Sequence, residues 1–187
     1  MSKASTTTTP ARYPDQPLNQ ATERWWVAKV KPRQEKLLAA DFLDEGIEYF
    51  LPLYAKNTPR PGTTHHRIFN VPLFPGYISF AQNQPHNIYR SGRVVNLIEI
   101  RHQRRFIHEL NQIYFALLGN APIEPVFDTF REGALVKITH GPFTGIEGIV
   151  SKDPASNRLI LSVECLGNAA LTIERSWITP VMQDDGV

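Results

Sequence analysis

After residue 23, hydrophobic and polar positions divide the chain into short apolar runs and two segments of helical spacing. Residues 33–45 place Leu38 and Phe42 on one stripe with charged side chains around it, and Gly46 follows as a stop signal. Residues 103–117 repeat this spacing with phenylalanine, leucine and isoleucine. The pattern predicts two helices that each bury one face.

Apolar runs rich in aromatic and β-branched residues predict strands between these helices. They cover residues 25–30, 47–54, 67–71, 76–81 and 94–100. The polar, proline-containing stretch 56–67 predicts an exposed hairpin loop with a basic, flexible tip. The fold class expected for residues 24–118 is therefore α+β, an antiparallel sheet flanked by helices.

Residues 119–129 lack periodicity and contain Pro122 and Pro125, so they are the expected linker. Short β-rich runs separated by turn residues follow at 134–139, 146–152, 158–164, 169–173 and 178–181. Closure would remove the exposed edges of such a small sheet. We therefore expect residues 130–181 to form a small all-β barrel of SH3-like shape.

Both ends of the chain differ in composition from the two expected domains. Residues 1–23 are rich in Ser, Thr, Pro, Asn and Gln and have few large apolar side chains. Such a segment buries too little surface to offset the entropy of ordering. We expect a disordered N-terminal tail over 1–23 and a second tail over 182–187.

Charge is distributed unevenly between the two expected domains. The net charge is only +2, but Arg24 to Leu117 contain 13 Lys and Arg against 7 Asp and Glu. Phe130 to Val181 contain 5 of each sign. A moderately basic first domain is compatible with weak or assisted contact with a phosphate backbone.

The remaining composition indicates a cytoplasmic binding protein without a cofactor. The lone Cys165 cannot form an intramolecular disulfide, and no apolar stretch predicts a signal peptide or a membrane span. His65 and His66 lack the ligand spacing of a zinc site, so no metal is expected. The carboxylates Glu35 and Asp41 are assigned to a solvated helix face, so no catalytic residue and no enzymatic activity is expected.

A glycine-rich turn stands out in the second domain. Gly141, Pro142, Phe143, Gly145 and Gly148 lie between two β-branched runs. No Lys-Ser/Thr pair follows and no helix is expected, which argues against a phosphate-binding loop. The glycines instead indicate a tight turn with close packing. With its flanking runs, Val-Lys-Ile-Thr-His-Gly-Pro-Phe-Thr-Gly-Ile-Glu-Gly-Ile-Val resembles the KOW motif of transcription and ribosome-associated proteins.

The first domain carries a second, independent resemblance. Trp-Trp-Val at 25–27, Gln-Glu-Lys at 34–36, Phe-Leu-Pro at 50–52 and Val-Pro-Leu-Phe-Pro-Gly-Tyr at 71–77 follow the order and spacing of the N-terminal domain of NusG-family elongation and antitermination factors. The resemblance covers about residues 24–181. It implies that the first domain binds the clamp helices of RNA polymerase and suppresses pausing, and that the KOW domain recruits Rho or a ribosomal protein.

The resemblance also suggests individual contact residues. Rigid aromatic anchors suit a small domain that clamps a coiled coil. The residues assigned to polymerase are Trp26, Lys29, Phe74, Tyr77, His86 and Asn87. Phe74 and Tyr77 match the family's Phe-Pro-Gly-Tyr segment, with core packing as their alternative role, and core packing is an equally simple role for Trp26.

Contacts with non-template or upstream DNA are assigned to Lys31, Arg33, Arg60 and Arg67. A solvated loop is the alternative for the last two. The first two are similar to DNA-contacting positions of specialised members such as RfaH. His86 falls where those members carry a His-Thr-Thr run that faces the polymerase lobe, but Asn87, Ile88 and Tyr89 replace the threonines, and a solvated polar loop is the alternative. The sequence thus favours a monomeric, specialised member; the alternative is a translation-associated or RNA-binding KOW protein that does not contact polymerase.

Overall fold

The computed structural model describes residues 9–18, 23–59, 62, 66–120, 122–126, 133–151 and 157–181. The N-terminal part is built on a five-stranded sheet of order β1-β3-β6-β2-β7. Its strands are β1 (Arg12–Tyr13), β2 (Trp25–Val30), β3 (Glu48–Phe50), β6 (Tyr77–Ala81) and β7 (Val94–Glu99). The helical elements are α1 (Glu35–Asp44), the 3₁₀ helix η1 (Pro85–Ser91) and α2 (Gln103–Leu118).

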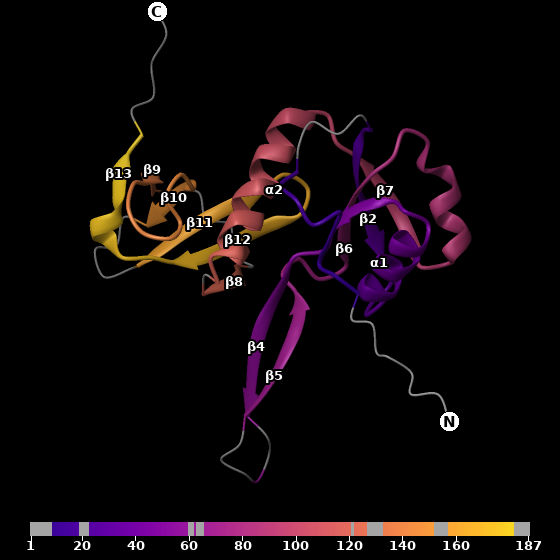
Figure 1. The fold of residues 1–187 in the computed structure, drawn as a ribbon, viewed down its shortest axis with the longest axis horizontal. Helices are drawn as coiled ribbons and strands as arrows, with labels where there is room; N and C mark the ends of the chain where they lie inside the picture. The colour runs from indigo at the N-terminus through magenta and orange to yellow at the C-terminus, as the bar shows by residue number, and fades with distance from the viewer. Residues whose placement is uncertain are drawn as a thin grey trace, which may run out of the picture.

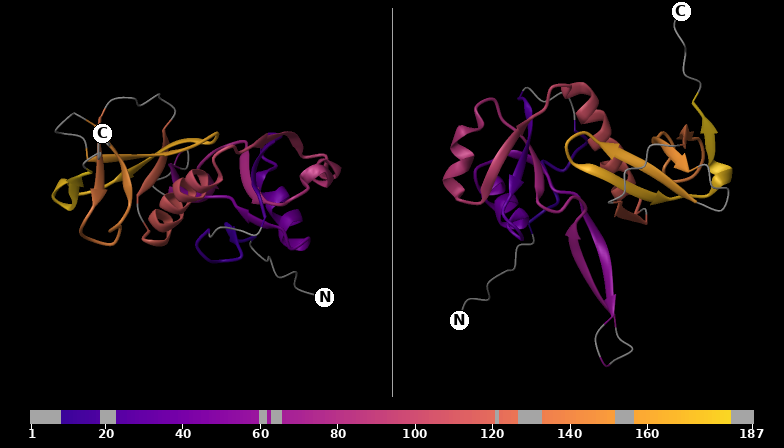
Figure 2. Two further views of the ribbon diagram at one scale, coloured as in Figure 1. Left: turned by 90° about the horizontal axis from the view of Figure 1, so that it is seen from above. Right: turned by 180° about the vertical axis from the view of Figure 1, so that it is seen from behind.

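A two-stranded ribbon leaves this sheet and projects from the body of the molecule (Figures 1 and 2). It consists of β4 (Leu53–Pro59) and β5 (His66–Pro72), which pair with each other in a sheet of their own. We call it the arm. The predicted loop 56–67 was therefore too long, because strand pairing extends on one side to Pro59 and on the other to His66.

The C-terminal part is an antiparallel sheet of order β13-β9-β10-β11-β12-β8. Its elements are β8 (Ile123–Val126), β9 (Gly133–Ile138), β10 (Glu147–Ser151), β11 (Arg158–Val163), β12 (Gly167–Thr172), the 3₁₀ helix η2 (Arg175–Trp177) and β13 (Ile178–Pro180). Among the described residues, the strand pairs run from β13 to β8 without a pair that joins these two edges. Five of its six strands lie close to their predicted positions, and closure of the sheet into a barrel stays a prediction.

The sequence did not predict two short strands. Residues 123–126 of the expected linker form β8, an edge strand on β12, where Pro125 is tolerated because one side of an edge strand needs no partner. Part of the expected tail is also ordered. Arg12 in β1 is 4% exposed, donates to the carbonyl of Tyr49 at 2.9 Å and pairs with Glu48. These contacts come from residues distant in sequence, so composition alone did not indicate them.

Alternation along β2 divides the N-terminal core into two layers. Trp25 and Val27 point to one face, and Ala28 and Val30 to the other. Helix α1 covers the second face. The first face is covered by α2 and, beyond it, by the C-terminal sheet, whose apolar side chains join the same buried cluster. Figure 1 shows α2 between the two sheets.

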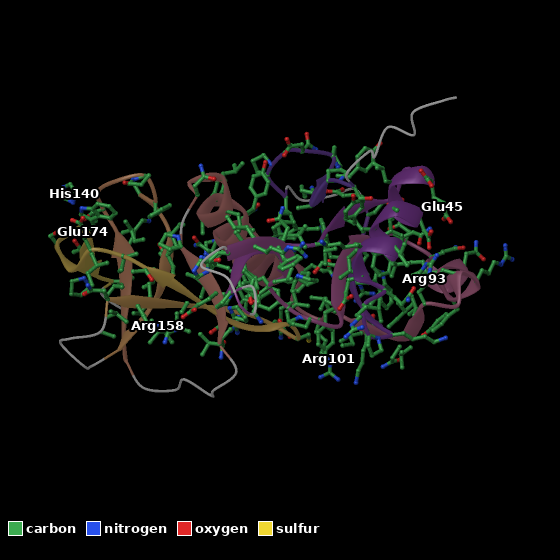
Figure 3. The ribbon with its side chains drawn as sticks, turned by 90° about the horizontal axis from the view of Figure 1, so that it is seen from below. Glu45, Arg93, Arg101, His140, Arg158 and Glu174 are labelled. Carbon is green, nitrogen blue, oxygen red and sulfur yellow. The ribbon has the colours of Figure 1, made fainter. Side chains whose placement is uncertain are left out.

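The charged ends of the molecule lie far from this shared core. Figure 3 shows His140 and Glu174 at the end formed by the C-terminal sheet, and Glu45 and Arg93 at the opposite end. No helix in the described part of the chain is long and apolar enough to cross a membrane.

Candidate functional site

The Phe-Pro-Gly-Tyr segment forms a tight turn that leads into β6. Gly76 has φ +86°, and the Tyr77 N–H donates to the carbonyl of Phe74 at 3.2 Å. Proline followed by a residue of positive φ is the arrangement of a type II turn, which favours glycine at the second position. The turn therefore fixes the directions in which the two aromatic side chains leave the backbone.

Helix α1 and strand β2 hold this turn from two sides. The Gly76 N–H donates to Oε1 of Glu35 at 2.8 Å, and the Gly76 carbonyl accepts from the Val30 N–H at 2.8 Å. Glu35 is 6% exposed, so the expectation that it points into solvent is wrong. A glutamate at a helix start can reach a neighbouring backbone amide, a contact that helical periodicity does not reveal.

The strand register places Lys29 beside this turn. Lys29 is paired with Tyr77 on β6 and with Asn96 on β7. Lys29 is exposed and Tyr77 is half-buried. Because side chains alternate along a strand, Lys29 shares a face with Trp25 and Val27. We call Lys29, Phe74 and Tyr77 the aromatic face.

Trp26 lies on the opposite face of β2, with the cluster that α1 covers. Its indole N–H donates to the carbonyl of Gln82 at 2.9 Å, and the Arg24 guanidinium lies 5.7 Å from its ring centroid. The structure therefore separates Trp26 from the aromatic face. A sequence resemblance that places both on one strand does not distinguish the two faces of that strand.

The C-terminal sheet covers Phe74. Only 4% of Phe74 is exposed, and its ring belongs to the cluster that contains residues of β9 to β12. A Cβ atom built on Gly167, at the start of β12, would lie 3.9 Å from Cδ1 of Phe74. The aromatic face is thus no open patch in this conformation, because the turn between β11 and β12 lies against it.

Polar and aromatic contacts extend this cover along α2. Oε2 of Glu109 accepts from the backbone N–H of Glu164 at 2.7 Å, and Oε1 of the same side chain pairs with Arg105 at 2.8 Å. At the end of α2, a Cβ on Gly119 would lie 2.5 Å from Cε1 of Phe143, so only glycine allows this approach. The interface therefore has a carboxylate near its middle and an aromatic ring at one end.

The Phe143 ring belongs to the glycine turn that the sequence predicted between Gly141 and Gly145. Gly141 and Gly145 have φ of +81° and +98°, and the Gly145 N–H donates to the carbonyl of Ile138 at 2.8 Å. Pro142 is exposed, whereas Phe143 is 7% exposed. Gly148 lies in β10, where a Cβ would meet the carbonyl oxygen of Ile160 at 2.6 Å. The turn residues thus shape the backbone and direct Phe143 toward α2.

The single cysteine lies on the turn that covers Phe74. Cys165 is exposed and has φ +65°, in the left-handed region. Partial burial, followed by the nearby carboxylates of Glu164 and Glu109, raises the pKa of its thiol. The thiol therefore reports on the contact between the two sheets.

Residues 23–116 match the family described as transcription termination factor nusG, and this match spans half of the chain. The chain belongs to the NusG family. No curated protein sequence gives a significant match.

Solved structures similar to this NusG-family chain share little sequence with it. The structure titled "Domain interaction in Thermotoga maritima NusG" has a TM-score of 0.46 and 16% identity, over 86% of this chain and 98% of that chain. The structure of the MjSpt4:Spt5 complex in conformation A has a TM-score of 0.25 and 16% sequence identity, over 85% of this chain and 99% of that chain. These scores carry no argument about domain placement, which rests here on the contacts described above.

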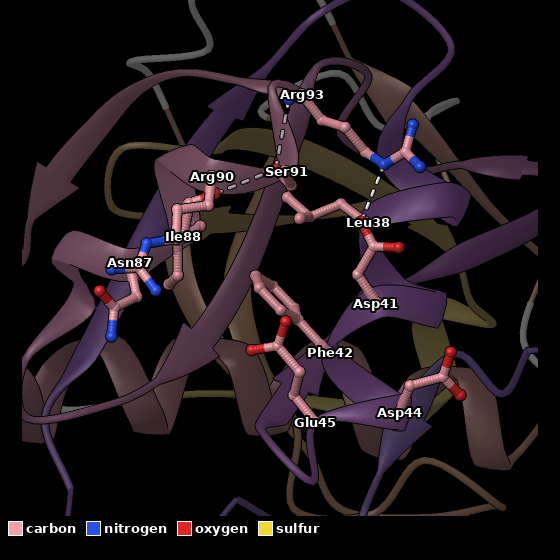
Figure 4. A pocket seen from close by; sticks show the side chains of 10 residues that line it. All are labelled: Leu38, Asp41, Phe42, Asp44, Glu45, Asn87, Ile88, Arg90, Ser91 and Arg93. Carbon is pink, nitrogen blue, oxygen red and sulfur yellow. Dashed lines mark hydrogen bonds and ion pairs between the residues drawn. The ribbon is translucent and has the colours of Figure 1, made fainter.

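Asn87 lies on the other side of the N-terminal sheet from the aromatic face. It is exposed in η1, beside Ile88, which packs with the α1 cluster. The groove between η1 and α1 has a volume of about 640 Å³ and contains an ion pair between Arg93 and Asp41 at 2.8 Å (Figure 4). The backbone of His86 belongs to η1, and its side chain lies outside the description.

The cations assigned to DNA lie at the start of α1 and on the arm. Lys31 and Arg33 are exposed, and Arg33 has φ +64°. Arg67 is exposed on β5 opposite Thr58. Arg60 and His65 lie outside the described residues. Within the described part of the chain, no three His, Cys, Asp or Glu side chains gather as a metal site would require.

Proposed function

We propose that this NusG-family chain is a transcription elongation and antitermination factor, a binding protein rather than an enzyme, that holds the clamp helices of RNA polymerase with its aromatic face. Lys29 forms the polar rim, and Phe74 and Tyr77 are the anchors. Aromatic side chains fixed by a turn lose little entropy on binding, so they suit the centre of an interface. Bridging the polymerase cleft in this way suppresses pausing.

The observation that carries the proposal is the cover over Phe74. The ring lies at a boundary between two sheets that share no strand pair, so we expect that the second sheet can move away from it without unfolding the first. A pocket of about 200 Å³ that is open to solvent lies between α2 and the C-terminal sheet, where Glu109, Leu135 and Leu161 help to line it. Separation of the sheets would expose the anchors, which makes polymerase and the C-terminal sheet alternative partners of the same face.

The C-terminal sheet is proposed to be a KOW domain that closes as an SH3-like barrel and recruits Rho or a ribosomal protein. The glycine turn from Gly141 to Gly145 supports this assignment, because its two positive φ values and its buried Phe143 fit a structural turn. Lys31, Arg33 and Arg67 are proposed to contact DNA near the polymerase. The factor is expected to act as a cytoplasmic monomer.

A role on particular operons, as for RfaH-like members, is part of the proposal. It rests on the Ser- and Thr-rich stretch at residues 5–9 and on the sequence 86–89, which favour a specialised member over the general factor. A contact with the polymerase lobe through η1 would then use the exposed Asn87 and Tyr89.

A single-round transcription assay with purified bacterial polymerase tests the proposal. Added protein should shorten pause lifetimes, and Tyr77→Ala should abolish most of that effect. Leu37→Ala serves as a control for the clamp contact, since this leucine is 48% exposed on α1, on the other side of the sheet. Unchanged pause lifetimes and unchanged Rho-dependent termination with wild-type protein would refute the proposal.

The translation-associated alternative gives a different result. A KOW protein that acts without polymerase would bind ribosomes or RNA tightly, and Phe74→Ala and Tyr77→Ala would leave that binding unchanged. Cosedimentation of the wild type and both variants with ribosomes separates the two functions.

A further inference from the structure

Strand β8 covers one edge of β12 in the C-terminal sheet. The two strands are antiparallel, with Leu171 opposite Ile123. The Thr172 N–H donates to the carbonyl of Pro122 at 3.0 Å, which is the next pair of the same register. Because hydrogen-bonded and non-bonded pairs alternate in an antiparallel ladder, every second residue of β12 directs its backbone groups at β8. These residues are Asn168, Ala170 and Thr172.

Few contacts hold β8 on this edge. The strand has four residues, of which Ile123 is the buried one, with 6% of its surface exposed. The ion pair between Glu124 and Arg158 joins side chains that are 60% and 48% exposed, and such surface pairs contribute little to stability. Among the described strands, none pairs with the outer side of β8, which borders a groove of about 540 Å³. Release of β8 from β12 therefore breaks few interactions.

The β12 edge under β8 lacks the features that protect an exposed edge. Edge strands are usually blunted by charged side chains, proline or a bulge. The two outer strands of this sheet follow the rule, since β8 contains Pro125 and β13 contains Pro180. By contrast, β12 reads Gly-Asn-Ala-Ala-Leu-Thr, without charge or proline, and its six pairs with β11 run without a bulge. Once uncovered, the β12 edge is a template for another strand.

The register also defines which strand fits this edge. Ile123 belongs to the buried cluster that contains Ala169 and Leu171 of β12. On the opposite face of β8, Glu124 pairs with Arg158. A strand that takes the place of β8 thus needs an apolar residue followed by a carboxylate. A shift of one residue would exchange the two faces and place the carboxylate against the core.

We propose that the β12 edge binds an extended segment of a partner protein that alternates apolar and acidic residues, and that β8 is the chain's own occupant of this site. The partner strand displaces β8 and does not add beyond it, because Pro125 lacks a donor on the outer edge. Backbone hydrogen bonds supply affinity in strand addition, and alternate side chains supply specificity. The connection between α2 and the C-terminal sheet therefore controls access to the site.

The inference deepens the recruitment proposed for the C-terminal sheet and rests on it. It gives the recruited protein a docking edge, a register and a competitor within this chain. It does not use the aromatic face, so it is independent of the clamp contact.

Hydrogen exchange of the full-length wild type, followed residue by residue with NMR, tests whether β8 leaves β12. The amides of Ala170 and Thr172 point at β8, whereas those of Ala169 and Leu171 point at β11 and serve as controls in the same strand. We expect the first two to exchange at least about tenfold faster, because local opening costs less free energy than opening of the sheet. Equal rates would overturn the inference.

Fluorescence anisotropy with a labelled peptide tests the docking edge itself. The peptide has the sequence of residues 120–127, Asn-Ala-Pro-Ile-Glu-Pro-Val-Phe, and stands in for the partner strand. Full-length Ile123→Asp should bind it at least about tenfold more tightly than the wild type, because its own β8 no longer competes. Val95→Asp is the matched control, since it places an acid on β7, an edge strand of the other sheet, at a position that is 55% exposed.

A second peptide with the Ile and Glu in reversed order should not bind. Equal binding of the two peptides, or equal affinity of the wild type and Ile123→Asp, would refute docking in this register. If Ile123→Asp does not fold, the exchange rates of the wild type decide. Recruitment is measured separately, by cosedimentation with ribosomes and by Rho-dependent termination. Register-specific peptide binding by a protein that affects neither would refute the proposed recruitment and leave the docking edge standing.

Discussion

Phe74 and Phe69 lie five residues apart in the sequence, yet 4% of the first side chain and 47% of the second is exposed. Phe69 lies in strand β5 of the arm, and Phe74 follows the end of that strand. Phe74 leaves the base of the arm in a turn held by Glu35 and is covered by the C-terminal sheet, whereas Phe69 lies on a ribbon whose two strands pair, among the described residues, only with each other. The chain itself therefore covers the ring of Phe74 and leaves the ring of Phe69 accessible to solvent.

The largest expected effect comes from removing each ring in turn. Phe74→Ala should lower the free energy of unfolding by about 3 to 5 kcal/mol, because a buried ring leaves a cavity. Phe69→Ala should change it by less than about 0.5 kcal/mol. Urea denaturation followed by tryptophan fluorescence measures both. Similar losses for the two variants would show that the arm is packed against something in solution.

Backbone strain at Gly76 tests how firmly the turn fixes the aromatic face. No atom lies within 4 Å of a Cβ added there, so the cost of Gly76→Ala is that of its φ of +86°, about 1 to 2 kcal/mol. Gly76→Asn should recover part of that stability, because asparagine tolerates this region. Urea denaturation measures the stability of both variants. Equal stability of the alanine variant and the wild type would contradict the positive φ of this turn.

Loss of the Glu109 carboxylate should weaken the contact between α2 and the C-terminal sheet and leave the structure of the arm unchanged. Its bond to the Glu164 N–H is at the domain interface, and one charged hydrogen bond contributes about 1.5 kcal/mol, or roughly a tenfold change in the opening equilibrium. Small-angle scattering of Glu109→Ala should give a larger radius of gyration. Glu99→Ala is the control, since its pair with Arg24 is exposed; expansion of both variants would argue against a specific effect.

The smallest expected effect is on the thiol at the interface. Because its pKa is raised above the ordinary 9.0, Cys165 carries less thiolate at a given pH and should react slowly with iodoacetamide. The deficit should be greatest below this pKa and vanish as the pH rises above it. Glu109→Ala should accelerate the reaction at pH 8, because it removes one of the carboxylates that raise the pKa. An unchanged reaction rate would mean that the Glu109 carboxylate on α2 does not affect the pKa of the Cys165 thiol.

Local patterns were sufficient to predict much of the fold. The strand at residues 25–30 and the helix at 103–117 agree with β2 and α2 almost to the residue. Their apolar positions repeat at the spacing of the element itself, so no distant contact is needed to recognise them. The α+β class of the N-terminal part and the strands of the C-terminal sheet follow in the same way.

Features that depend on contacts distant in sequence could not be predicted. Arg12 is buried because the Tyr49 carbonyl and the Glu48 carboxylate accept hydrogen bonds from its guanidinium, and a polar composition gave no sign of this. The same holds for the candidate site. Sequence resemblance suggested Phe74 as an anchor, but its cover by the turn beside Gly167 depends on how two sheets meet.

Strand β8 sets how far the two sheets can travel apart. Residues 119–122 separate the end of α2 from β8, and a fully extended chain of that length reaches roughly 14 Å. If β8 leaves β12, the free segment between Leu118 and Gly133 reaches roughly 50 Å. The connection between the two sheets therefore has a short reach while β8 is paired with β12 and a long reach when β8 is released. It determines the effective concentration at which a partner held by one sheet meets whatever the other sheet has bound.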